Sequence, residues 1–206
     1  MTLSELNRTF PDATEETWHQ HSNGGGWVEN TATVDDTAFV GPDAKVSDDA
    51  LVFGHARVYG HARVYGHATV FGNVRVFGTA TVSGNASVWG KASIYGDASI
   101  WGGASVYGNS RISGHAKVFD NASIWGEAKV YGNAMVFDQA KILDNARVYG
   151  GAWISGYARV FDNAWVRRNI GRTCMVSGNG KDIKIDVDFS RSVRYNSFGV
   201  NGDLKC

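Results

Sequence analysis

Residues 55–72 read HARVYG-HARVYG-HATVFG, three consecutive hexapeptides in which only two positions change. The pattern extends in both directions from this stretch without an inserted or deleted residue. Every sixth residue from Val34 to Val166 is Val or Ile, which makes 23 positions. A short period kept over so many repeats predicts a solenoid, in which each repeat is one structural unit stacked on the next.

Two further columns of residues accompany the Val and Ile series. The residue two places earlier is Ala except at Val74 and Ser110, and the residue two places later is Gly or Asp except at Pro42 and Arg168. Alternate residues of a strand point to the same side, so Ala and Val share the interior. Gly and Asp tolerate the left-handed backbone of a corner. Each hexapeptide is therefore predicted to be one short strand and one bend, whose apolar side is buried only by stacking.

The hexapeptide resembles the repeat of the bacterial transferase hexapeptide family, in which an aliphatic residue is followed four places later by a small one. Val58 with Ala62, and Val130 with Ala134, match that motif. The resemblance covers roughly residues 30–168, and the stretch His21-Ser-Asn-Gly-Gly-Gly-Trp-Val28 before the first coil looks like the entry of bacterial and phage members that lack an obvious catalytic loop. One departure is the aromatic residue that usually follows the aliphatic one here. The resemblance implies a left-handed parallel β-helix with three hexapeptides in each coil.

The predicted fold is all-β, with a hexapeptide-repeat β-helix over residues 32–168. Residues 1–31 are predicted to be a short helical cap, because Thr14 and the acids after it are typical of a helix N-terminus. Such a cap would cover the open edge of the first coil. Residues 169–206 are predicted to be a β tail that caps the last coil or pairs with another subunit.

Inside this tail, residues 177–180 read Ser-Gly-Asn-Gly, which predicts a turn. The alternation of apolar and charged residues from Ile183 to Phe189 predicts a strand after it. The cysteines are Cys174 and Cys206, and both lie outside the repeats. So few cysteines favour a reducing compartment, with a disulfide that ties the tail as the open alternative.

With three hexapeptides to a coil, outward residues 18 apart form ladders on three faces. The aromatic ladder of face one lies beside a column with Ser87, Ser105 and Ser123 at its middle, and no charge interrupts that middle part. A long apolar stripe of this kind predicts an interface between copies of the chain, and stacking of the rings in water is the alternative. The aromatic ladder comprises Phe53, Phe71, Trp89, Tyr107, Trp125, Leu143 and Phe161.

Face two combines rings with cations. Like charges one strand spacing apart, about 4.8 Å, repel each other, so an anionic ligand would stabilise them. The alternative is a solvated face balanced by corner acids such as Asp120, Glu127 and Asp144. The cation column comprises Arg57, Arg75, Arg111, Lys129 and Arg147, and the rings beside it are Tyr59, Phe77, Tyr95, Tyr131 and Tyr149.

Neither catalysis nor metal binding has a strong sequence signal. The resemblance implies acyltransferases that place a histidine in a cleft between subunits, but no loop interrupts these repeats to build one. The coil histidines are His55, His61, His67 and His115, and they occupy a corner slot that holds Asn in other repeats. No three of them share a corner at metal-binding distance. We therefore predict no catalytic residue, no metal and no cofactor, with a site formed by the histidine corners across subunits as the open alternative.

Composition limits the partners. Lys and Arg number 20, as do Asp and Glu, so the charge balance argues against nucleic acid. No secretory signal or membrane span is visible, which favours the cytoplasm, or a host's cytoplasm for a phage protein. The leading hypothesis is a non-catalytic homo-oligomer, a dimer or trimer, that sequesters a small anion such as a nucleotide. The alternatives are an acyl-CoA-dependent O- or N-acyltransferase and a structural fibre segment.

Overall fold

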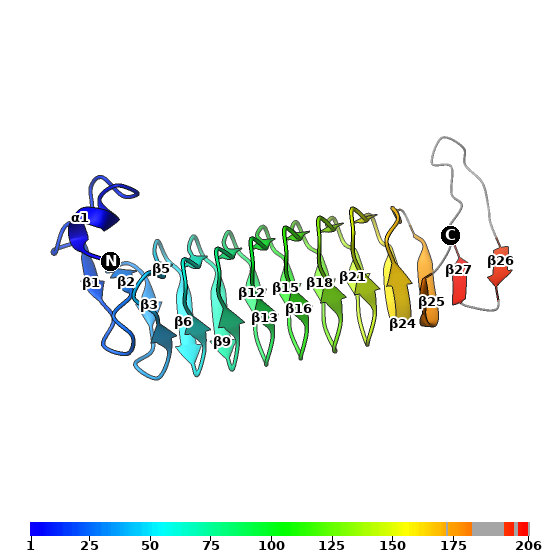
Figure 1. The fold of residues 1–206 in the computed structure, drawn as a ribbon, viewed down its shortest axis with the longest axis horizontal. Coiled ribbons are helices and arrows are strands. Elements are labelled where there is room, and N and C mark those ends of the chain that lie inside the picture. The colour runs from blue at the N-terminus through cyan, green and yellow to red at the C-terminus, as the bar shows by residue number, and fades with distance from the viewer. Residues whose placement is uncertain (172, 183–195, 200–201, 206) are drawn as a thin grey trace.

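The computed structural model describes residues 1–171, 173–182, 196–199 and 202–205. Over these residues the chain forms an elongated stack of β coils (Figure 1). Residues 18 apart pair in parallel register, for example Arg57 with Arg75 and Ser105 with Ser123. Three hexapeptides therefore make one coil, and the fold is the expected all-β parallel β-solenoid. The left-handed winding that the resemblance implies stays a prediction.

Each full coil contributes one strand to each of the three faces. Face one contains β3 (Thr33–Val34), β6 (Leu51–Gly54), β9 (Thr69–Gly72), β12 (Ser87–Val88), β15 (Ser105–Val106), β18 (Ser123–Ile124), β21 (Lys141–Ile142) and the start of β24 (Arg159–Val166). Face two contains β4 (Phe39–Val40), β7 (Arg57–Val58), β10 (Arg75–Val76), β13 (Ser93–Ile94), β16 (Arg111–Ile112), β19 (Lys129–Val130), β22 (Arg147–Val148) and the end of β24. Face three contains β2 (Trp27–Glu29), β5 (Lys45–Val46), β8 (Arg63–Val64), β11 (Thr81–Val82), β14 (Ser99–Ile100), β17 (Lys117–Val118), β20 (Met135–Val136) and β23 (Trp153–Ile154).

The interior is the predicted column of small and β-branched side chains. Val and Ile are fully buried at every position of the series from Val40 to Val166. Val34 is the exception, because it is only partly buried at the start of the series. The Ala column is buried in the same way from Ala38 onward. Stacked identical side chains thus fill the solenoid and leave the outward residues to define the surface.

The N-terminal cap differs from its prediction. No helix begins at Thr14, where the chain makes a single turn closed by hydrogen bonds from Thr17 and Trp18 to the Thr14 carbonyl. The chain then enters strand β1 (Trp18–Gln20), which pairs antiparallel with β2. The cap's short helix is instead α1 (Leu3–Leu6). Pairing with β2 favours the strand over the helix that the local sequence predicts.

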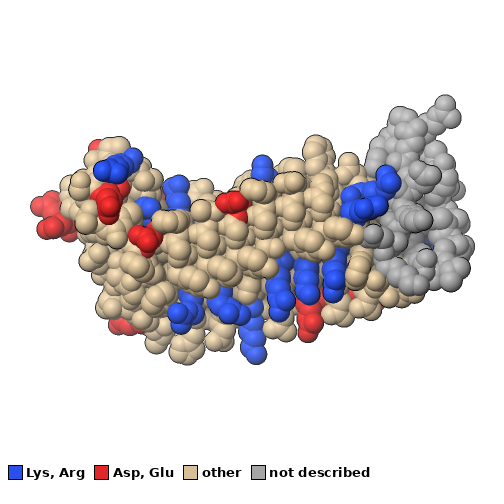
Figure 2. Space-filling model, viewed as in Figure 1, with Lys and Arg blue, Asp and Glu red and all other residues tan. Residues whose placement is uncertain are grey.

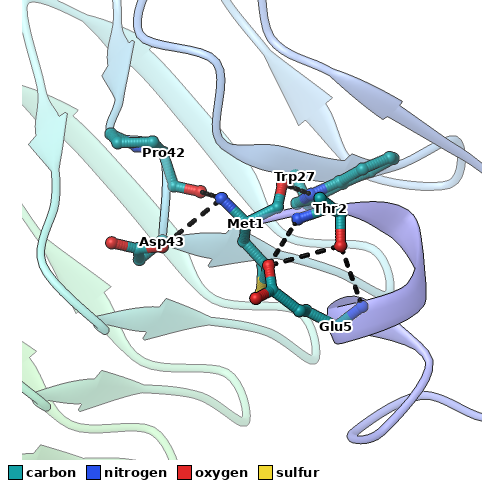
Figure 3. Close-up of polar contacts among 6 residues, drawn as sticks. All are labelled: Met1, Thr2, Glu5, Trp27, Pro42 and Asp43. Atoms are coloured by element: carbon teal, nitrogen blue, oxygen red, sulfur yellow. Dashed lines mark hydrogen bonds and ion pairs between the residues drawn. The ribbon is translucent and has the colours of Figure 1, made fainter.

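Polar contacts of Met1 attach the start of the cap to the first coils (Figure 3). Thr2 and Glu5 form a reciprocal capping box, and the Thr2 backbone N–H, which donates to the carboxylate at 2.7 Å, lowers the pKa of Glu5 below its usual 4.5. The Trp27 indole N–H donates to the Met1 carbonyl at 3.1 Å, and the Met1 amine lies 3.5 Å from the Asp43 carboxylate. The cap therefore docks on the solenoid through polar contacts of Met1 and through Leu6 of α1, which is buried in one cluster with Trp27.

At the other end, β25 (Met175–Asp182) pairs in parallel with β24 and continues the sheet. The turn predicted at residues 177–180 is wrong, because these residues lie within β25. Strand β27 (Gly202–Lys205) pairs antiparallel with both β25 and β26 (Asn196–Gly199). The strand predicted from Ile183 to Phe189 lies outside the described residues. Cys174 is disulfide-bonded, so the structure has the disulfide that was the alternative and not the free thiol that the low cysteine count favours; Cys206 lies outside the described residues.

Candidate functional site

The cation column lies in register on face two, as the sequence predicts. Each cation is followed on its own strand by a buried Val or Ile. Because successive residues of a strand point to opposite sides, the five cationic side chains all point outward. Ser93 on β13 separates the column into a pair, Arg57 and Arg75, and an uninterrupted trio of Arg111, Lys129 and Arg147. Figure 2 shows Lys and Arg side chains gathered along the lower edge of the solenoid, with few acidic side chains among them.

Aromatic residues close the column at both ends, and the sequence reasoning missed them. The Arg57 guanidinium lies over the Phe39 ring and the Arg147 guanidinium over the Trp165 ring, both at 4.5 Å from the ring centre. Phe39 is 18 residues before Arg57, and Trp165 is 18 residues after Arg147. Extending the 18-residue register by one step would have found both. These contacts stabilise the end cations by about 0.5–1 kcal/mol each.

The corner acids do not neutralise the column. Among the described residues, no ion pair joins any of its five cations to Asp or Glu. The Asp120 carboxylate instead accepts a hydrogen bond from the Asp138 backbone N–H at 3.3 Å, and that of Asp144 accepts from the Asp162 N–H at 3.1 Å. These two carboxylates form hydrogen bonds to the backbone of neighbouring corners. The charges of the central cations are therefore not neutralised by them.

The rings beside the column form two stacks. Tyr59, Phe77 and Tyr95 stack at centroid distances of 4.9 and 5.0 Å, with planes within 6° of parallel. Tyr131 stacks on Tyr149 at 5.3 Å. Between the two stacks stands Ser113, which the 18-residue register places where a further ring would be. Among the described residues, Tyr95 and Tyr131 therefore each have one ring face without a stacked ring, beside the trio of cations.

The aromatic ladder of face one also stacks. The rings from Phe71 to Trp125 lie at centroid distances of 5.9, 4.4 and 5.7 Å, with planes within 5° of parallel. Within this run Trp89, Tyr107 and Trp125 are half-buried in the single chain, and stacking covers one or both of their ring faces. The surface left for a partner consists mainly of ring edges, which is less apolar area than the side chains alone suggest.

A groove opens at the C-terminal end of this ladder. It has a volume of about 280 Å³ and is lined by Trp125, Leu143 and Phe161 of the ladder together with Lys141, Arg159 and Met175. The sequence predicts an interface role for the three ladder residues, and Lys141, Arg159 and Met175 lie outside that prediction. Met175 could not be assigned from the repeat, because it follows the break in period after Val166.

The coil histidines lie at exposed corners. The His67 Nδ1 atom is 3.5 Å from the Asp49 carboxylate, and the His115 Nδ1 atom is 3.3 Å from that of Asp97. Each partner belongs to the preceding coil, so these pairs link corners. Within the described part of the chain, no three His, Cys, Asp or Glu side chains are grouped closely enough to hold a metal ion. No described helix is long and apolar enough to cross a membrane.

The fold defines the class of protein: it is a parallel β-solenoid built from hexapeptide-like repeats. A family model described as the YdcK beta solenoid repeat matches residues 56–78, which lie in the coils where the hexapeptide is most regular. No curated protein and no solved structure matches the chain. The family match thus agrees with the fold over a short segment.

Proposed function

We propose that this protein is a non-catalytic binding scaffold that holds a small, multiply charged anion on face two. The observation that carries the proposal is the trio Arg111, Lys129 and Arg147, which stands in register without an acidic partner among the described residues. Adjacent strands place these charges about 4.8 Å apart, so they repel each other in the free protein. A ligand with several negative charges would relieve the repulsion along the whole trio.

A nucleotide is the ligand class that the face supports best. The break in the ring stack at Ser113 leaves one ring face each of Tyr95 and Tyr131 without a stacked ring among the described residues, next to the trio. The two tyrosines are two coils apart, about 10 Å by strand spacing, so one planar base would lie about 5 Å from each. A base would thus continue the stack while its phosphates contact the cations through charge-assisted hydrogen bonds.

The test is titration of the purified protein with ATP by calorimetry at two salt concentrations. We expect saturable binding that weakens as salt screens the cations, and recovery of unchanged ATP. The variant Arg111→Gln with Lys129→Gln should lower the affinity by more than about tenfold, because each lost charge-assisted hydrogen bond costs 1 kcal/mol or more. The matched control is Arg63→Gln with Lys117→Gln on face three, which should bind ATP as the unmodified protein does.

Two outcomes would contradict the proposal. One is the absence of ATP binding at low salt. The other is an equal loss of affinity in the control, which would indicate a diffuse charge effect. In a separate test, replacing Ser113 by Tyr should lower the affinity for ATP more than the affinity for tripolyphosphate. The added ring occupies the position of the base and leaves the cations in place.

The middle part of the aromatic ladder, from Phe71 to Trp125, remains the proposed contact between copies of the chain, a homo-oligomer of two or three. This part lies beside small Thr and Ser residues and carries no charge. Rigid rings lose little side-chain entropy when they are buried, and aromatic residues frequently dominate the energetics of interfaces. A symmetric contact would place like faces together around an axis.

We therefore expect Trp89→Lys with Trp125→Lys to give a smaller particle by light scattering, because four lysines would meet in a dimer interface. Far-UV circular dichroism should keep its β-type shape, since both side chains point outward. The control is Trp101→Lys with Phe119→Lys, which places two lysines at stacked rings of face three. An unchanged mass in the face-one variant, or a monomeric parent protein, would show that the ladder is not the interface.

A further inference from the structure

The groove at the end of the aromatic ladder exists because one ring of the ladder is missing. Ring stacking on face one ends at Trp125, and the next position of the ladder, directly after β21, is Leu143. Leucine is shorter than a Trp or Tyr side chain, so the outer part of this position is empty. Phe161 on β24 resumes the ladder one coil later, and the groove of about 280 Å³ lies between them.

The spacing of this groove suits a flat ring. Trp125 and Phe161 are two coils apart, about 10 Å by strand spacing. A planar ring placed over Leu143 would lie about 5 Å from each neighbour, within the range of 4.5–7 Å that aromatic pairs prefer. The volume lies just below the usual range of ligand pockets, which indicates a molecule of one or two rings.

The edge of the groove carries positive charge. Lys141 and Arg159 occupy the outward positions of β21 and β24, side by side in register. Among the described residues, neither makes an ion pair. The carboxylate of Asp144, at the following corner, accepts a hydrogen bond from the Asp162 backbone N–H. An apolar floor with two neighbouring cations selects an anion with a flat apolar body.

Met175 completes the site from the strand beyond the repeats. It pairs in register with Arg159 and is 43 % exposed, although methionine is more often buried. A thioether interacts favourably with an aromatic ring and adapts to its shape, so Met175 suits an aromatic ligand. Strand β25 thus contributes a wall that the regular coils do not have.

We propose that this groove is a second binding site, separate from the cation column, that takes a small aromatic monoanion such as an aryl carboxylate. The ring stacks between Trp125 and Phe161 over Leu143, and the carboxylate contacts Lys141 and Arg159. A nucleotide suits this site less well, because only two cations line it and the tyrosine faces beside the trio lie on another face of the solenoid.

The test compares 2-naphthoate with the neutral 2-naphthol by calorimetry on the full chain. We expect naphthoate to bind at least about tenfold more tightly than naphthol. Replacing Leu143 by Trp fills the position with a protein ring and should abolish the binding of both. The variant Lys141→Gln with Arg159→Gln keeps all apolar walls of the groove. It should lower the affinity for naphthoate about tenfold and the affinity for naphthol less than about twofold.

The matched control is Ser113→Tyr, which fills the other break in a ring stack and should leave naphthoate binding unchanged. Equal affinity for naphthoate and naphthol in the parent protein would overturn the proposal, as would no naphthoate binding at millimolar concentration. Unchanged naphthoate binding by the Leu143→Trp variant would place the ligand elsewhere. If that variant does not fold, the glutamine pair alone decides, because its positions are outward.

Discussion

Replacing Val106 by Asp is expected to prevent folding. Val106 lies on β15 at the centre of the stack, is fully buried, and pairs in register with Val88 on one side and Ile124 on the other. A carboxyl group there has only aliphatic neighbours in the inward column. Burying it without a partner costs several kcal/mol, a large part of the 5–15 kcal/mol that typically stabilises a domain. Far-UV circular dichroism and soluble yield would measure the loss.

The matched control for this change is Ser105→Asp, on the same strand and one residue earlier. Ser105 is outward and half-buried, so its carboxylate would remain hydrated, and the fold should persist with a small change in unfolding midpoint. If the Val106→Asp protein folds and unfolds like its parent, then the Val and Ile column does not form the core. Equal damage from both variants would indicate sensitivity to charge on face one rather than to burial.

The repeat made the core and the three faces predictable. A period of six with Val or Ile at each step admits one inward column, and the family resemblance supplied the three hexapeptides per coil that set the 18-residue register. From those two facts the neighbours of Arg111 or Trp89 follow without a structure. The cation column and the aromatic ladder are therefore where the sequence places them, although their roles remain proposals.

The ends were less predictable, because there the neighbours are not repeats. The turn at Thr14 carries helix-start residues, yet the following chain joins β2 as a strand. Residues 177–180 carry turn residues, yet pairing with β24 holds them in β25. Val34 satisfies the repeat but is only partly buried at the start of the series. In each case tertiary contacts, rather than local preference, determine the outcome.

The groove at Leu143 escaped the sequence for a different reason. The ladder was assembled from residues that share an apolar character, and Leu143 satisfies that criterion as well as Trp125 does. Side-chain size, rather than polarity, decides whether the stack continues. The same consideration applies to Ser113 on face two, where the missing ring was visible in the sequence but its consequence for the neighbouring tyrosines was not.

The corners require a left-handed backbone, which restricts the residues that can occupy them. Among the described non-glycine residues, those with positive φ are all aspartates, namely Asp48, Asp120, Asp138, Asp144 and Asp162. The carboxylates of Asp48 and Asp138 each accept a hydrogen bond at 2.8 Å from the backbone N–H of the corner 18 residues later. This charge-assisted bond between coils offsets the strain of the left-handed backbone by about 1–2 kcal/mol. Alanine has the same strain and no such bond.

Replacing Gly84 by Ala is therefore expected to lower the free energy of unfolding by about 2–3 kcal/mol. Gly84 has φ of +64°, and a Cβ atom added there would lie 2.8 Å from the Gly102 backbone nitrogen. Gly84→Asp should lower the free energy of unfolding by less, because its carboxylate can accept a hydrogen bond from the Gly102 N–H. Gly151→Ala should be nearly neutral, since a Cβ atom there meets nothing within 4 Å and its φ is not left-handed. The urea midpoint should be highest for Gly151→Ala, lower for Gly84→Asp and lowest for Gly84→Ala. A midpoint of Gly84→Asp at or below that of Gly84→Ala would show that the carboxylate does not stabilise the corner.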